Sequence, residues 1–253
     1  MIIVWGNKHV YRTIGFVADF CPLCRGIKGF LLRRVGLAGH VYYITSGEGK
    51  LVGYQRTCEG CKTIFNADAE KYASVIKKAA SLDDLLHQTY PTLPIVIAER
   101  LALEEKVKNT PALLSSSERQ ELLRAPFALL SPKIEKQFAR LQFDKEIGFS
   151  MVGVIVFLMI FPTLLQNFFP KHQEESLLIF IALSLIFLGW QFFTARQRFI
   201  RHQIIPVLAK AIRPLNPTES EMKSILDEMR QQKHKMGSKL KIDDLIDQLQ
   251  NSN

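Results

Sequence analysis

Two short cysteine motifs are the strongest chemical signal in this sequence. The first, CPLCRG, covers residues 21–26, and the second, CEGC, covers residues 58–61. Together they contain all four cysteines of the 253-residue chain. A CxxC pair places two sulfurs on one tight turn, and two such turns that face each other supply the four ligands of a tetrahedral ion. The predicted metal ligands are therefore Cys21, Cys24, Cys58 and Cys61.

Structural zinc is the interpretation that this ligand set favours. Four cysteine ligands leave no open coordination position, so the metal would hold the fold together and would not act on a substrate. Three other interpretations stay open. They are a thioredoxin-like redox pair, two disulfides in an oxidising compartment, and iron in a rubredoxin-like site, which uses the same four sulfurs.

The 33 residues between the two CxxC pairs predict a β-hairpin. The segments LAGHVYYIT (37–45) and KLVGYQRT (50–57) are rich in β-branched and aromatic residues, and the turn sequence SGEG separates them. In the first cysteine turn, Pro22 and Gly26 suit a tight loop, because glycine readily takes a positive φ. We therefore expect a turn, a hairpin and a second turn, which together make a zinc ribbon.

The opening IIVWGNK, the motif CPLCRG, a hairpin and a closing CxxC pair resemble the small bacterial zinc-ribbon proteins. The resemblance covers about the first 65 residues, and some of these proteins carry the ribbon beside membrane helices. It departs at the second turn, where Lys62 follows Cys61 in place of the usual glycine. The resemblance implies a fold and a bound metal, and it implies no reaction.

The predicted ribbon is basic. Residues 1–65 carry nine lysines and arginines against three acidic residues, whereas the rest of the chain carries 24 against 21. Basic side chains near the cysteines would help to keep the thiolates ionised, and they could also contact anionic lipid, nucleic acid or an acidic partner. The candidate contacts are Arg25, Lys28, Arg33, Arg34, Arg56 and Lys62.

Helical periodicity follows from residue 66 onward. Apolar residues recur at three- and four-residue spacing in segments 67–90 and 94–109. A helix is expected in 115–130, and a new one at Ser131, with Ser131 as N-cap and Pro132 at the first helical position. In the tail, Thr218 and Glu221 form a capping-box signal for a helix over 219–235 that ends at Gly237, and a short helix follows over 241–250.

Two long uncharged runs predict a membrane-spanning helical hairpin over 147–193. The runs cover 147–169 and 176–193, and at a rise of ~1.5 Å per residue both approach the ~30 Å thickness of a hydrocarbon core. Lysines and arginines number four shortly before the first run, one between the runs and four shortly after the second. This distribution predicts cytosolic termini in an integral protein of the bacterial inner membrane.

The expected fold class is therefore mixed: a β zinc ribbon (1–65), a cytosolic helical region (66–146), a transmembrane helical hairpin (147–193) and a helical tail (194–253). No HExxH, GxSxG or GxGxxG motif is present, and the chain is not expected to be an enzyme. We expect a membrane-anchored binding or scaffold protein with structural Zn²⁺, the lipid bilayer and a protein as partners. The alternatives are a membrane-tethered nucleic-acid-binding regulator and an accessory subunit of a larger membrane enzyme or transporter.

Overall fold

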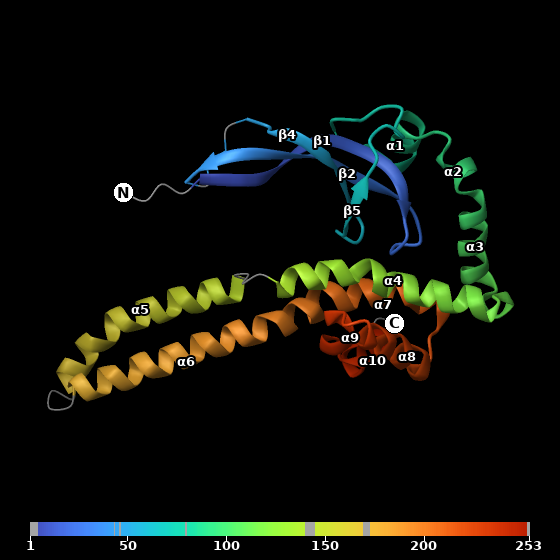
Figure 1. The fold of residues 1–253 in the computed structure, drawn as a ribbon. Helices are drawn as coiled ribbons and strands as arrows, with labels where there is room; N and C mark the ends of the chain where they lie inside the picture. Colours follow the sequence, from blue (N-terminus) through green and yellow to red (C-terminus); the bar gives the residue numbers. More distant parts are fainter. Residues whose placement is uncertain are drawn as a thin grey trace. The chain divides into compact units, whose positions relative to one another are not determined.

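A computed structural model describes residues 5–42, 44–45, 47–78, 80–139, 145–168 and 173–251. The chain begins with strands and continues as helices (Figure 1). The strands are β1 Trp5–Cys21, β2 Gly26–Val41, β3 Ile44–Thr45, β4 Lys50–Cys58 and β5 Ile64–Ala67. The helices are α1 Leu82–Thr89, α2 Leu93–Val96, α3 Ala98–Asn109, α4 Ser116–Phe138, α5 Lys145–Phe168, α6 Gln173–Phe199, α7 Ile205–Ile212, α8 Glu219–Gln231, α9 Lys235–Lys239 and α10 Ile242–Asn251.

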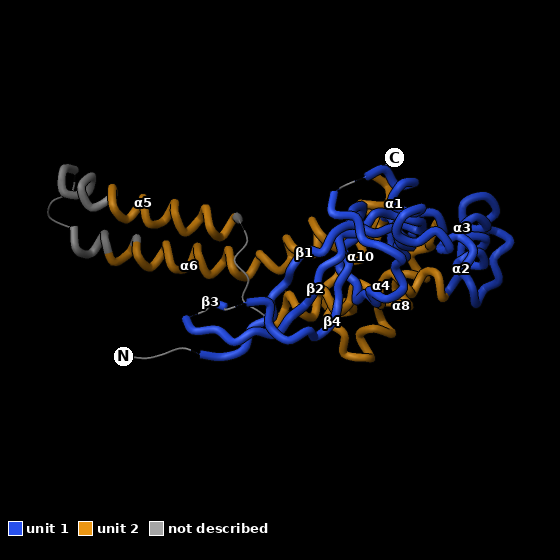
Figure 2. The backbone as a smooth tube through the Cα atoms, turned by 90° about the horizontal axis from the view of Figure 1, so that it is seen from above, with its two compact units in different colours: residues 1–120, 210–215 blue, residues 121–209, 216–253 orange. Residues whose placement is uncertain are grey.

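The chain divides into two compact units (Figure 2). Unit 1 consists of Met1–Gln120 and Lys210–Leu215, and unit 2 consists of Glu121–Ala209 and Asn216–Asn253. Unit 1 contains the sheet and both cysteine motifs. Unit 2 contains α5, α6 and the tail helices.

An antiparallel sheet with strand order β1-β2-β4-β5 forms the body of unit 1, and the short β3 pairs with β2. β1 and β2 form a long hairpin whose register runs from Trp5 opposite Val41 to Cys21 opposite Gly26. The predicted hairpin of segments 37–45 and 50–57 is displaced along the chain. β4 pairs with the earlier part of β2, from Phe30 opposite Cys58 to Leu37 opposite Lys50, so Leu37 is the only residue of the first predicted segment that pairs with β4. The strand that contains Leu37 is longer than expected, because β2 begins directly after the first cysteine turn.

α1 packs on β1 and β2 near the cysteine end of the sheet. The Thr89 hydroxyl accepts a hydrogen bond from the Ala18 backbone N–H at 2.9 Å and donates one to the Leu85 carbonyl at 2.7 Å. The largest buried side chains of this core include Phe30, Leu32 and Leu85. The cysteine end of the β1–β2 hairpin is therefore covered by α1.

The expectation of a helix over 67–90 is wrong in its first half. β5 extends to Ala67, and Phe16 and Ile76 form an isolated antiparallel bridge through two backbone hydrogen bonds of 2.7 and 3.1 Å. The close approach requires Gly15, because a Cβ there would lie 2.4 Å from the Ile76 carbonyl oxygen. Only α1 forms within this segment, capped by the Ser81 hydroxyl, which accepts from the Asp84 N–H.

α4 is one continuous helix, although two helices were predicted there. It contains Pro126 and Pro132 in its interior, and Ser131 lies in mid-helix and not at an N-cap. Each proline removes one backbone hydrogen bond, but burial of one face offsets that loss. The buried apolar residues of this face are Leu122, Leu123, Phe127, Leu130 and Ile134.

The helices of the tail agree more closely with their predicted bounds than segment 67–90 and α4 do. α8 begins with a complete capping box formed by Thr218 and Glu221, and α10 covers the predicted final helix. α8 ends at Gln231, four residues earlier than expected. Gly237 does not end it but lies within α9, where a Cβ would come within 2.5 Å of the Arg230 backbone nitrogen.

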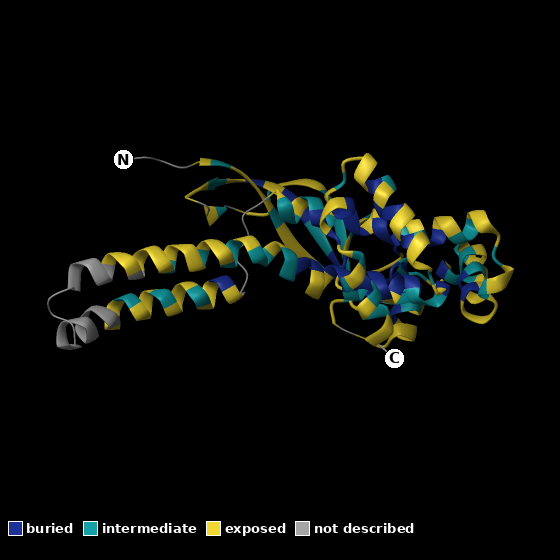
Figure 3. Ribbon diagram, turned by 90° about the horizontal axis from the view of Figure 1, so that it is seen from below, coloured by how far each residue is buried: buried dark blue, intermediate teal, exposed yellow. Residues whose placement is uncertain are grey.

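The prediction of a transmembrane hairpin is wrong. The two apolar runs lie in α5 and α6, which pack side by side (Figure 1), and most of their described side chains are exposed (Figure 3). Among the described residues, no helix is long and apolar enough to cross a membrane.

The same finding corrects the fold class and the localisation. The described part of the chain is a β-sheet followed by helices, and it does not support an integral membrane protein with a spanning hairpin. Phe169, the last residue of the first expected span, and residues 170–172 of the expected loop lie outside the described residues.

Candidate metal centre

Two hairpin turns bring the four cysteines to one end of the sheet. β1 and β2 enclose the first turn, between Cys21 and Gly26, and β4 and β5 enclose the second, between Cys58 and Ile64. β2 and β4 are neighbours, with Phe30 opposite Cys58. This register places both turns at the same end of the sheet. The pairing of β2 with β4 therefore brings Cys24 close to Cys58, which lies 34 positions later in the chain.

The sulfur geometry fits a tetrahedral metal site. Cys21 Sγ lies 3.6 Å from Cys61 Sγ, and Cys24 Sγ lies 3.9 Å from Cys58 Sγ. All four sulfurs lie within 4.8 Å of one another. A tetrahedron with metal–sulfur bonds of about 2.3 Å has sulfur–sulfur edges of about 3.8 Å, which falls between these two distances.

The four cysteines are free thiols. A disulfide would need a sulfur–sulfur separation of about 2.05 Å, much shorter than these contacts. Cys21, Cys58 and Cys61 are buried, and Cys24 is half-buried. The cluster can therefore bind a metal ion in a site largely screened from solvent.

The two cysteine turns share one backbone conformation. The residue after the second cysteine of each motif has a positive φ: 54° at Arg25 and 56° at Lys62. Gly26, which was expected to take this role, does not have a positive φ. In the second turn the Lys62 N–H donates to the Cys58 carbonyl at 2.9 Å. Lys62 therefore adopts the conformation usual for the glycine that it replaces, at a cost in backbone strain.

Gly60 is required by the packing of the sulfurs. A Cβ at this position would lie 3.1 Å from Cys24 Sγ and 3.8 Å from Cys58 Sγ. The second turn thus passes directly over the sulfurs of both motifs, and a side chain there would press on two ligands at once.

The thiols differ in their affinity for protons. Hydrogen bonds from Cys21 and Cys24 lower the pKa of Cys58 to about 7. Hydrogen bonds from Cys21, Cys24 and Cys58 lower the pKa of Cys61 as well, whereas those to Cys24, Cys58 and Cys61 raise the pKa of Cys21. A divalent cation at this cluster would bind the four sulfurs as thiolates and displace their protons.

Arg25, a candidate contact for an anionic partner, points into unit 1. Its guanidinium is buried, pairs with Glu104 at 2.6 Å and donates to the Ala211 carbonyl at 2.6 Å. Arg100 also pairs with Glu104, at 2.8 Å. Arg25 therefore ties the first cysteine turn to α3 and to the end of α7, and its charge is neutralised within the fold.

Arg56 belongs to a second buried charge cluster. Asp19, which is 3% exposed, contacts Arg56 and Lys71 and accepts a hydrogen bond from the Tyr72 hydroxyl at 2.6 Å. The Arg56 guanidinium also lies 4.9 Å from the centre of the Phe30 ring. Burial lowers the pKa of Lys71 to about 8 and raises the pKa of Tyr72 to about 12.

This cluster was not found in the sequence analysis. A lone carboxylate inside the apolar run GFVADF (15–20) was the available signal, because a buried acid needs a cationic partner. The partners were not recognisable, since Arg56 comes from another strand and Lys71 from a segment that had been interpreted as helix.

The remaining basic candidates lie in three different settings. Arg34 donates to the Glu48 and Gly49 carbonyls at 2.8 and 2.9 Å, in the turn that precedes β4. Lys28 and Arg33 are half-buried, and Lys62 is exposed. Three of the six candidates, Arg25, Arg34 and Arg56, thus have partners inside unit 1.

Comparison with known proteins yields no match: no family model, no curated protein and no solved structure matches the chain. The likeness of residues 1–65 to the small zinc-ribbon proteins remains a prediction from the motifs.

Proposed function

We propose that this protein binds one structural zinc ion through Cys21, Cys24, Cys58 and Cys61, and that it acts as a binding module without catalytic turnover. The observation that carries the proposal is the sulfur cluster: two sulfur–sulfur distances, 3.6 and 3.9 Å, are close to the edge of a tetrathiolate tetrahedron, and all four sulfurs lie within 4.8 Å of one another. Cysteine thiolates are soft ligands, which suit zinc better than magnesium or calcium. Iron with the same ligands is an outcome that the metal analysis would reveal.

The zinc would lock the two hairpins together at one end of the sheet. β1 with β2 and β4 with β5 are each closed by a cysteine turn, and the metal would add a cross-link between the turns. With all four positions filled by protein, the metal has no position for a substrate or water, so its role is in the fold. The binding role is then left to the surface of the folded protein, with another protein as the proposed partner.

Elemental analysis of the full-length protein, purified anaerobically, tests the metal. About one equivalent of zinc per chain is expected, and less than half an equivalent of any metal would contradict the proposal.

Co-purification then tests the binding role. Wild type and Cys21→Ser would be compared at equal protein levels, and identical sets of bound proteins would exclude the zinc-stabilised sheet as the binding element.

A further inference from the structure

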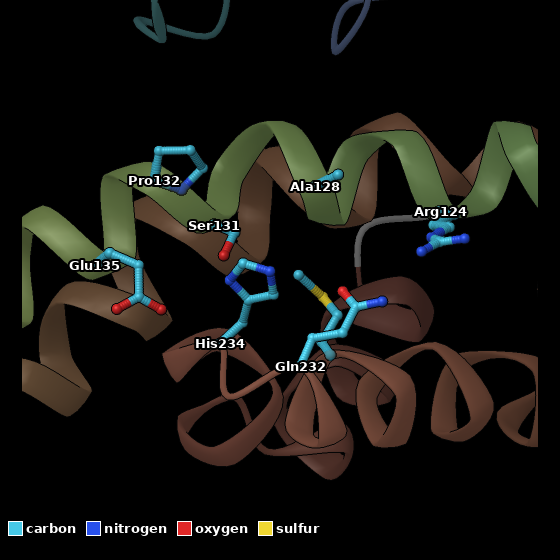
Figure 4. A pocket seen from close by; sticks show the side chains of 8 residues that line it. Arg124, Ala128, Ser131, Pro132, Glu135, Gln232 and His234 are labelled. Carbon is cyan, nitrogen blue, oxygen red and sulfur yellow. The ribbon is translucent and has the colours of Figure 1, made fainter.

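Unit 2 contains a cavity of about 380 Å³ beside α4 (Figure 4). This volume falls in the range of small-molecule sites, roughly 300–1,000 Å³. One wall is a single face of α4, and the other is α8 with the link to α9. The lining residues are Arg124, Ala128, Ser131, Pro132, Glu135, Met229, Gln232 and His234.

A helix-terminating turn positions the second wall. At the end of α8 the Lys233 N–H donates to the Arg230 carbonyl and the His234 N–H to the Met229 carbonyl, at 3.0 and 2.9 Å. Lys233 has a φ of 62°. These two bonds and the left-handed residue make a Schellman motif, which fixes the chain direction after the helix. The imidazole of His234 is thereby directed at α4, as Figure 4 shows.

The middle of the cavity contains an unsatisfied polar group. Ser131 is 3% exposed, and among the described residues its hydroxyl has no hydrogen-bond partner. A helical serine usually donates to the carbonyl four residues earlier, and this one does not. Figure 4 shows the Ser131 oxygen pointing toward the His234 ring inside the cavity. A buried hydroxyl without a hydrogen-bond partner is unfavourable in free energy. A ligand that supplies the missing hydrogen bond would remove this cost and therefore bind more tightly.

Apolar side chains surround the Ser131 hydroxyl. Ala128 and Pro132 line the cavity from α4, and Met229 lines it from α8. The cavity therefore combines one unpartnered hydroxyl with apolar surface on both walls.

The charged groups at the two ends already have partners. Arg124 pairs with Glu228, which also accepts a hydrogen bond from the Gln232 amide at 3.1 Å. Glu135 accepts a hydrogen bond from the Lys235 backbone N–H. The middle of the cavity consequently favours a neutral ligand over an ion.

We propose that this cavity binds a small neutral molecule with an apolar body and a carboxamide group. The carboxamide both donates and accepts hydrogen bonds, as the facing Ser131 hydroxyl and His234 imidazole require. The apolar body would lie against Ala128, Pro132 and Met229. The site is independent of the metal centre, because all of its residues belong to unit 2.

Three probes that share one ring test the proposal on the full chain: benzamide, benzoate and benzylammonium, titrated by NMR at neutral pH. Benzamide is expected to bind with a millimolar Kd, as suits a probe of so few atoms, and at least about threefold more tightly than either ion. Absence of benzamide binding, or equal or tighter binding of an ion, would overturn the proposal.

Variants locate the site. Ser131→Ala is expected to weaken benzamide binding about threefold to tenfold, the effect of one hydrogen bond, and to leave the melting temperature of the free protein unchanged or raised. Ser224→Ala changes an exposed serine of α8 and is expected to have no effect on either. Ala128→Trp, which places a ring in the cavity from an exposed position, is expected to abolish binding. Wild-type affinity in Ser131→Ala or Ala128→Trp would contradict the assignment.

Discussion

The cysteine end of the sheet in unit 1 and the cavity beside α4 in unit 2 differ in how their buried polar groups are satisfied. In unit 1, Asp19 has three polar side-chain partners, Arg25 contacts the Glu104 carboxylate and the Ala211 carbonyl, and the four thiols contact one another. In unit 2, the Ser131 hydroxyl is buried without a partner at the wall of an open cavity. Paired charges and clustered thiols stabilise a fold, whereas a hydroxyl without a partner beside a cavity is suited to a ligand.

The largest expected effect is the loss of a metal ligand. Cys58→Ser should release the zinc and unfold the sheet of unit 1, because structural zinc contributes about 10–16 kcal/mol in small domains. Hydrogen exchange would show lost amide protection in β2 and β4, with protection retained in α8. Glu59→Ser, an exposed change in the same turn, is the control. Retained amide protection of β2 in Cys58→Ser would show that the sheet of unit 1 does not depend on the metal.

A smaller but still large loss is expected at the buried charge cluster. Asp19→Ala leaves Arg56 and Lys71 without their carboxylate and should cost about 3–5 kcal/mol of unfolding free energy in urea. The exposed pair of Arg12 with Glu48 serves as the contrast, since Arg12→Ala should cost less than about 1 kcal/mol. Equal losses of unfolding free energy in Asp19→Ala and Arg12→Ala would show that burial does not make the Asp19 cluster more stabilising than the exposed pair of Arg12 with Glu48.

The pH dependence of stability should reveal Lys71. Its pKa is lowered to about 8 in the folded chain by burial, against 10.5 ordinarily. Between these values the unfolded state binds the proton and the folded state does not, so this residue makes stability rise with pH from about 8 to 10. Thermal unfolding of wild type and Lys71→Met across that window measures the effect. A wild type without any rise relative to the variant would contradict it.

The smallest effect is expected at two glycines of the cysteine turns. Gly60→Ala presses a methyl group against Cys24 Sγ and should cost about 1 kcal/mol, as overpacking does. Gly26→Ala meets no atom within 4 Å and should leave the melting temperature unchanged. The reverse order would show that the first turn, and not the second, is the tightly packed one.

The clustering of the four cysteines could be predicted from the sequence, but their surroundings could not. Four cysteines in two CxxC pairs are a local signal, and so is the capping box of Thr218 and Glu221. The partners of Asp19 depend on strand register and could not be read from local patterns. The prediction of a new helix at Ser131 and Pro132 was wrong, because burial of one face of α4 outweighed the local N-cap signal. The apolar runs of α5 and α6 predicted spans that the described helices do not bear out.

X-ray absorption at the zinc edge of the full-length protein tests the central claim most directly. We expect one zinc with four sulfur neighbours at about 2.3 Å and no nitrogen or oxygen neighbour. A first shell that mixes sulfur with nitrogen or oxygen, or fewer than four sulfurs, would contradict a closed site formed by Cys21, Cys24, Cys58 and Cys61.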